Sequence, residues 1–174
     1  MKISTKVSFS AIMTALAILL LFLGGLLGTL DLTTAAIASL CVVFVVIELG
    51  YKYAALIYAT SSLLGFLILP AKTCVLFFAA FFGFYPIVKS FAEKYSKVIS
   101  YVIKFAVYFV SYAVIIIIWM ALFTKGNEPL LLIALFLPLA GAIVLPIYDI
   151  ALTKLITSYS YSIRKRLGID RYLK

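Results

Sequence analysis

The chain contains no histidine and only two cysteines, and just 12% of its 174 residues are charged. Without histidine, the usual zinc and haem sites and Ser-His catalysis are excluded. Cys41 and Cys74 have no metal-binding or redox spacing, and because they fall at different depths in their hydrophobic runs, we expect no disulfide between them. A Gly-rich phosphate loop and the acidic pair of intramembrane proteases are also missing. We therefore expect a protein that is not an enzyme and that binds no cofactor or metal.

Hydrophobic residues make up 66% of the sequence, and they are gathered into long runs. A helix needs about 20 residues to cross the hydrocarbon core of a bilayer. The sequence predicts an all-α integral membrane protein, a single compact bundle of six transmembrane helices over residues 1–174 that ends in a basic cytoplasmic tail, 159–174. The six runs are approximately 9–29, 32–48, 54–69, 73–92, 98–123 and 129–158.

The 15 lysines and arginines are distributed unevenly between the two sides that such a bundle would have. Only Lys72 and Lys125 fall on one side. Because positive charge resists translocation, the other side is predicted to be cytoplasmic, together with both termini. We expect a multi-pass protein of a prokaryotic plasma membrane, whose net charge of +9 faces anionic lipid rather than nucleic acid. The predicted cytoplasmic side collects Lys2, Lys6, Lys52, Lys89, Lys94, Lys97, Lys104, Lys154, Arg164, Lys165, Arg166, Arg171 and Lys174.

The first run carries a stripe of small residues, Ser4, Ser8, Ala11 and Ala15, spaced so that they share one helical face. We call these four residues the small-residue stripe. Small side chains let another helix approach closely, which favours helix association in lipid. The pattern leaves two possibilities open: the stripe packs inside this bundle, or it docks onto a partner.

Several of these features are similar to one transporter family. The short basic N-terminus, the pair Ala11 and Ala15, the run Ala-Ile-Met-Thr-Ala-Leu-Ala-Ile over 11–18 and the run Phe-Gly-Phe-Tyr-Pro-Ile-Val-Lys over 82–89 resemble the substrate-binding S components of energy-coupling factor (ECF) transporters. The resemblance implies docking through Ala11 and Ala15 onto a transmembrane coupling subunit that two cytoplasmic ATPases drive. It also implies a small-molecule nutrient ligand, such as a vitamin. Cobalt and nickel are disfavoured, because the metal-specific relatives carry an N-terminal histidine segment.

The alternative is a membrane scaffold similar to the MreD-like proteins of cell-shape and cell-wall assembly, which are also small, polytopic and without catalytic residues. An importer would capture its ligand on the outer face, so polar and aromatic residues there are the candidates for binding. Tyr58 and Tyr112 are also within reach of that face. The candidate ligand-binding residues are Asp31, Lys72, Trp119, Asn127 and Glu128.

Charged residues and prolines also interrupt the hydrophobic runs. Lys104 and Asp149 lie at similar depth near the cytoplasmic side, and because an unpaired charge there is costly, we predict an intramembrane ion pair between them. Lys104 could instead extend to the interface. Lys89 and Glu93 are four apart near a helix end and are expected to form an ordinary surface pair. Pro86, and the group Pro138, Gly141 and Pro146, predict bends in the fourth and sixth runs.

Overall fold

The computed structural model describes residues 3–28, 30–70, 72–123, 144, 146–159 and 161; of Lys97 and residues 118–123 it describes the backbone alone. The chain divides into two compact units, residues 2–117 and residues 118–174 together with Met1. All regular secondary structure in the described residues is helical, and these residues contain no strand. The prediction of one single bundle over the whole chain stays a prediction.

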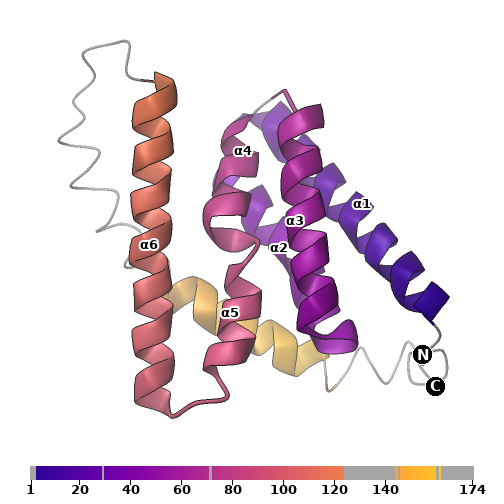
Figure 1. The fold of residues 1–174 in the computed structure, drawn as a ribbon, viewed down its shortest axis with the longest axis vertical. Coiled ribbons are helices and arrows are strands. Elements are labelled where there is room, and N and C mark those ends of the chain that lie inside the picture. The colour runs from indigo at the N-terminus through magenta and orange to yellow at the C-terminus, as the bar shows by residue number, and fades with distance from the viewer. Residues whose placement is uncertain are drawn as a thin grey trace. The chain divides into compact units, whose positions relative to one another are not determined.

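The first unit holds most of the helical elements (Figure 1). Within the second unit, residues 146–158 are helical. The elements are α1 (Ile3–Leu27), α2 (Asp31–Leu49), α3 (Tyr51–Ile68), α4 (Lys72–Phe77), the π-helix η1 (Phe78–Phe82), α5 (Tyr85–Ala92) and α6 (Lys97–Phe123), of which residues up to 117 belong to the first unit.

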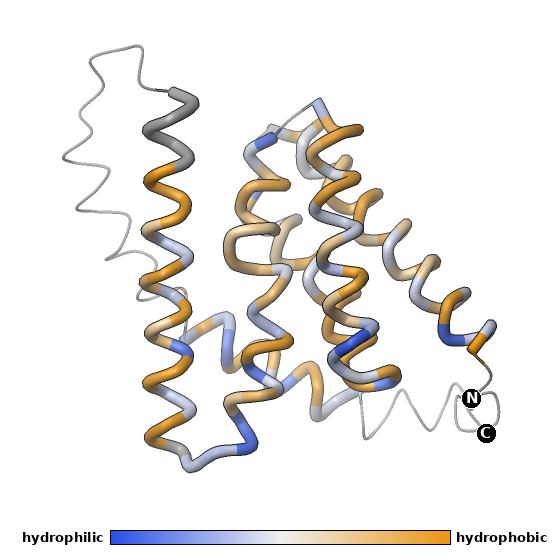
Figure 2. Tube along the Cα trace, viewed as in Figure 1, coloured by the Kyte–Doolittle hydropathy of each residue, from blue (hydrophilic) through white to orange (hydrophobic). Residues whose placement is uncertain are grey.

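Five helical stretches in the described part of the chain are long and apolar enough to cross a membrane. They coincide with the first five predicted runs, and α4, η1 and α5 together form the fourth span, Lys72–Ala92. Figure 2 shows that hydrophobic residues occupy most of each helix, with the strongly hydrophilic ones mostly near the ends. Of the sixth run, 129–158, the part that contains Pro138 and Gly141 lies outside the described residues, and Pro146 lies within a helical part that includes Val144 and residues 146–158.

The helices of the first unit are joined by very short turns. Gly28 ends α1 with φ +66°, and Gly50 alone separates α2 from α3 with φ +85°. Glycine adopts this left-handed conformation without the steric penalty of a side chain, so it commonly follows the last turn of a helix. The Gly50 amide donates to the carbonyl of Val45. Neighbouring helices are therefore antiparallel, as the predicted topology requires.

Small residues lie where α1 meets its neighbours. α1 packs mainly on α2 and α3, and its fully buried positions include Ala17 and Gly24. A Cβ atom on Gly24 would lie 1.9 Å from the Thr34 hydroxyl oxygen and 3.1 Å from the Cys74 sulfur. Only glycine therefore fits at this crossing of α1, α2 and α4. Such close contact is the main source of helix association in lipid.

The fourth span is not a regular helix. At η1 the backbone widens into a π-turn, in which the Gly83 amide donates to the carbonyl of Phe78 at 2.7 Å. The Tyr58 hydroxyl, on α3, donates to the carbonyl of Ala79 at 2.7 Å. Pro86 then lies in the first turn of α5, where its missing amide costs little. The bend predicted at Pro86 is thus a break over Phe78–Phe84, and Pro86 starts the helix that follows it.

Two cation–π contacts show which helix ends lie together in the first unit. The Lys6 ammonium is 5.7 Å from the centre of the Tyr53 ring, and the Lys94 ammonium is 4.5 Å from the Tyr51 ring. The start of α1, the turn between α2 and α3, and the end of α5 therefore share one end of the unit, which we call the basic end. Lys72 begins α4 at the other end, where its ammonium donates to the carbonyls of Phe66 and Leu69. The lysine distribution within this unit is therefore as uneven in space as in the sequence.

Candidate functional site

Two of the predicted ligand-binding residues, Asp31 and Lys72, lie at the end of the first unit opposite the basic end. Lys72 is exposed, and its ammonium caps the last carbonyls of α3, donating to Leu69 at 2.6 Å. Asp31 is half-buried in the first turn of α2, where its charge is favourable beside the helix amides. Its carboxylate oxygen Oδ1 is buried and has no hydrogen-bond partner within the described residues. Ligand binding by either residue stays a prediction.

Cys74 connects the starts of α2 and α4 at this same end. Its sulfur lies 3.3 Å from the Thr34 hydroxyl oxygen and donates to the Asp31 carbonyl at 3.4 Å. Cys41 and Cys74 are both buried and free. Together with the glycine crossing at Gly24, these contacts tie α1, α2 and α4 together.

The other predicted ligand-binding residues cannot be placed. Trp119 lies near the end of α6, but its side chain is outside the described part of the structure. Asn127 and Glu128 lie outside the described residues altogether. Tyr58 is placed differently from expectation, because its hydroxyl is bound to Ala79 at the break in the fourth span rather than directed to the outer face.

All four residues of the small-residue stripe are exposed. On the same helix, Ala17, Leu21 and Gly24 are buried, and at 3.6 residues per turn they lie on the opposite side of α1 from the stripe. Packing of the stripe among the helices of this unit is therefore excluded. Its four small side chains lie on the side of α1 away from these buried residues.

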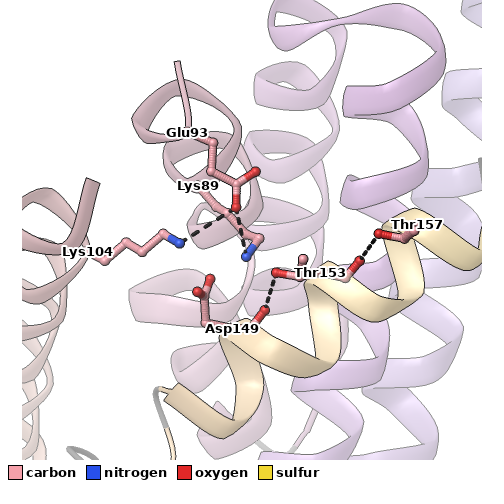
Figure 3. A network of polar contacts seen from close by, with 6 residues as sticks. All are labelled: Lys89, Glu93, Lys104, Asp149, Thr153 and Thr157. Atoms are coloured by element: carbon pink, nitrogen blue, oxygen red, sulfur yellow. Dashed lines mark hydrogen bonds and ion pairs between the residues drawn. The ribbon is translucent and has the colours of Figure 1, made fainter. Parts of the chain in front are cut away.

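Lys89, Glu93 and Lys104 form a charge cluster at the basic end (Figure 3). One oxygen of Glu93, Oε1, lies 3.1 Å from the Lys89 ammonium and 3.6 Å from the Lys104 ammonium. The side chains of Lys89 and Lys104 are only 1% and 8% exposed, whereas Glu93 is 46% exposed. The carboxylate thus bridges α5 and α6 at the boundary between the interior and the surroundings.

The predicted pair between Lys89 and Glu93 forms, but the prediction that it lies on the surface is wrong for Lys89, which is buried. Lys89 shares a face of α5 with Tyr85 and Ala92, and all three are buried. Sequence reasoning missed it because the spacing to Glu93 and the nearby end of the hydrophobic run fit an exposed position equally well. The available signal was the spacing of Lys89 from Tyr85 and Ala92, four and three residues, which places a lysine on the apolar face. Buried ammonium groups require compensating partners, so removal of the shared carboxylate is expected to destabilise both.

Lys104 is about 10 Å along α6 from its first residue, at 1.5 Å per residue. It is buried and bound to Glu93, so it does not extend alone to the interface. Asp149, its predicted partner, belongs to the second unit, so the predicted pair stays a prediction. Within the second unit, the Thr153 hydroxyl donates to the Asp149 carbonyl and the Thr157 hydroxyl to the Thr153 carbonyl, both at 2.8 Å (Figure 3).

One face of α6 is polar and buried over about three turns, from Ser100 to Ser111. Ser100, Lys104, Tyr108 and Ser111 follow one another at spacings of four, four and three residues, and each is less than 9% exposed. Between them, large apolar side chains such as Val102 are exposed. The Tyr108 ring meets the Phe81 ring of η1 edge-on, with centroids 6.2 Å apart. In a bilayer, polar side chains on a helix face typically point toward protein or a water-filled path.

The described residues contain no group of three or more Cys, Asp or Glu side chains that could hold a metal ion. No protein family, curated protein or solved structure matches this chain.

Proposed function

We propose that this protein is the membrane-embedded substrate-binding subunit of an ECF-type importer for a vitamin-like micronutrient. In this role the basic end faces the cytoplasm of a prokaryotic cell, and α1 docks onto a separate transmembrane coupling subunit driven by two ATPases. The resemblance of residues 11–18 and 82–89 to the S components motivates the proposal. The observation that carries it is the exposure of Ser4, Ser8, Ala11 and Ala15 on the side of α1 away from its packed face.

The physical reason concerns what a lipid-facing helix surface contains. Most other exposed positions on α1 are large and apolar, for example Ile12 at 63% and Leu26 at 64% exposure. A continuous stripe of serine and alanine interrupts that surface and lets the backbone of another helix approach closely. Close approach of two helices provides packing contacts that lipid chains do not supply. The stripe therefore suits a helical partner better than it suits lipid.

Tryptophan substitutions test this docking. Ala11→Trp and Ala15→Trp should abolish co-purification with a co-expressed coupling subunit, because the indole fills the space that a partner helix needs. The thermal stability of the isolated subunit should change little, since both positions are exposed. Leu16→Trp is the matched control: this position is 44% exposed on the same helix but lies away from the stripe, and assembly should survive.

Ala17→Trp provides the opposite reference. Ala17 is fully buried, and overfilling a packed site typically costs ~1–3 kcal/mol, so this variant should lose stability whether or not a partner is present. Docking through the stripe would be refuted if Ala11→Trp assembled normally, or if it lost stability as Ala17→Trp does.

Orientation and ligand binding need separate measurements. Reporter fusions at residues 51 and 95 should locate the basic end in the cytoplasm, and fusions at 31 and 72 should report the outside. Mass spectrometry of the purified protein should detect a retained small molecule. A scaffold of the MreD-like kind predicts instead that no small molecule is retained and that cell-wall synthesis proteins co-purify.

A further inference from the structure

Three lysines from different parts of the first unit lie around the start of α3, at the basic end. Lys52 is exposed in the first turn of α3, between Tyr51 and Tyr53. The Lys94 ammonium lies 4.5 Å from the centre of the Tyr51 ring, and the Lys6 ammonium lies 5.7 Å from that of the Tyr53 ring. Successive residues of a helix project about 100° apart, so Lys52 projects between the two ring contacts. We call Lys6, Lys52 and Lys94 the lysine arc.

The lysine arc differs from the charge cluster at the same end of the unit. Lys89 and Lys104 are buried and share the carboxylate of Glu93. Within the described part of the chain, no carboxylate forms an ion pair with a lysine of the arc. A tyrosine ring attracts an ammonium group and fixes its position, but the positive charge remains. The arc therefore presents positive charge that the described residues do not neutralise.

Apolar side chains are exposed beside this charge. Each lysine of the arc has a large hydrophobic residue within four positions in the chain. These residues are Val7, Leu56 and Phe91, which are 55%, 59% and 50% exposed. A soluble anion needs the positive charge alone, whereas a phospholipid needs positive charge for its phosphate and an apolar surface for its acyl chains. The combination at the basic end therefore fits a lipid better than it fits a soluble anion.

We propose that the lysine arc binds the phosphate headgroups of anionic phospholipids in the leaflet at the basic end. The three ammonium groups contact phosphate oxygens, and the acyl chains lie along the exposed apolar side chains of α1, α3 and α5. Tyr51 and Tyr53, both half-buried, hold Lys94 and Lys6 in position for this contact. The site shares no residue with the small-residue stripe, and it does not depend on what α1 docks onto.

Native mass spectrometry of the full chain in detergent, titrated with phosphatidylglycerol or phosphatidylcholine, tests the site. Phosphatidylglycerol should bind more tightly, and its advantage should shrink as salt is raised, because salt screens exposed charges. Each of Lys6→Gln, Lys52→Gln and Lys94→Gln should weaken its binding about fivefold, which corresponds to the ~1 kcal/mol that a lysine contributes near an anionic lipid surface. Lys72→Gln is the matched control: Lys72 is an exposed lysine at the opposite end of the unit, so this change should leave the affinity unaltered.

Two further measurements separate lipid binding from a purely structural role and from binding of a soluble anion. Lys52 takes part in neither ring contact, so Lys52→Gln should weaken phosphatidylglycerol binding without lowering the thermal stability of the lipid-free protein, and Lys52→Arg should retain the affinity. Glycerol 3-phosphate at the same concentration should not displace the lipid, because it has no acyl chains.

Weaker phosphatidylglycerol binding in all three glutamine variants, with Lys72→Gln unaffected, supports the site. Equal affinity for the two lipids, an unchanged affinity in any of the three variants, or an equal loss in Lys72→Gln overturns it. Displacement by an equal concentration of glycerol 3-phosphate also overturns it, since the lysines would then bind phosphate without the lipid.

Discussion

α1 and the fourth span are both about as long as a bilayer crossing, yet they differ in how much of each is buried and in how regular the helix is. In the most apolar part of α1 only 17% of the residues are buried, whereas in the fourth span 56% are buried. α1 is a regular helix throughout, while the fourth span is broken at η1 and carries the buried Lys89. A helix that faces lipid must satisfy its backbone hydrogen bonds internally, so irregular backbone is tolerated only where protein can supply partners. Here Tyr58 supplies one.

The largest effect is expected from breaking the packed side of α1. Gly24→Leu would drive a side chain into Thr34, whose oxygen lies 1.9 Å from the position of the added Cβ atom. Because Thr34 and Cys74 join α2 and α4 at this point, we expect a loss of about 3 kcal/mol or more in the free energy of unfolding, at the upper end of the overpacking range. Thermal unfolding in detergent measures it.

Leu26→Trp serves as the matched control for this substitution. Residue 26 lies on the same helix two positions away but is 64% exposed. A surface change of this kind usually alters stability by no more than about 0.5 kcal/mol. Equal destabilisation by Gly24→Leu and Leu26→Trp would contradict the division of α1 into a packed side and an exposed side.

The sequence predicted α1 better than it predicted the fourth span. Hydropathy located all five spans within the described residues, because apolar run length follows bilayer thickness directly. The boundary error is largest at α1, which begins at Ile3 rather than near residue 9. Helical hydrogen bonding continues through Ser4, Thr5 and Lys6, polar residues that a hydropathy criterion excludes. Spacing alone also grouped the small-residue stripe correctly on one face.

The break in the fourth span, the burial of Lys89 and the cap formed by Lys72 were harder to predict from the sequence, because they depend on contacts between residues that are distant in the chain. Pro86 indicated a disturbance in the fourth span, but the break lies at Phe78–Phe82, where Tyr58, about twenty residues earlier, donates to the Ala79 carbonyl. The burial of Lys89 depends on Glu93 and on the helices around α5. In the structure, the Lys72 ammonium caps the end of α3. This contact cannot be recognised in the sequence, where Lys72 looks like a polar residue of an outer loop and is therefore a candidate for ligand binding.

An intermediate effect is expected from the charge cluster of the fourth span. If Lys104 pairs with Asp149 as the sequence predicts, the variants Lys104→Met and Asp149→Leu should be non-additive, with a coupling energy of at least 0.5 kcal/mol. The reason is that each single change already breaks the predicted pair, so the second change in the double variant has no pair left to break. Unfolding of both single variants and the double variant provides the complete cycle.

Glu93 provides the test of the alternative, in which Lys104 is paired within the first unit and not with Asp149. Its oxygen lies 3.6 Å from the Lys104 ammonium, so Lys104→Met and Glu93→Gln should also be coupled. Coupling to Glu93 combined with additivity within 0.3 kcal/mol for Asp149 would show that the cluster is complete within the first unit and that the predicted pair is wrong.

The smallest effect is expected at the basic end, where α1 and the fourth span each place a lysine over a tyrosine of α3. Exposed cation–π contacts contribute ~0.5–1 kcal/mol and weaken with distance. Lys94 lies 4.5 Å from the Tyr51 ring and Lys6 lies 5.7 Å from the Tyr53 ring, so Lys94→Gln should cost more stability than Lys6→Gln. Lys6 also stands in the first turn of α1, where positive charge opposes the helix dipole, which reduces its net contribution further. Exposed Lys52 belongs to the same end, and Lys52→Gln should have the least effect of the three. Chemical unfolding at low and moderate salt measures the order Lys94, Lys6, Lys52; a loss at Lys6 that equals or exceeds the loss at Lys94 would mean that these ring contacts do not determine the stability of the basic end.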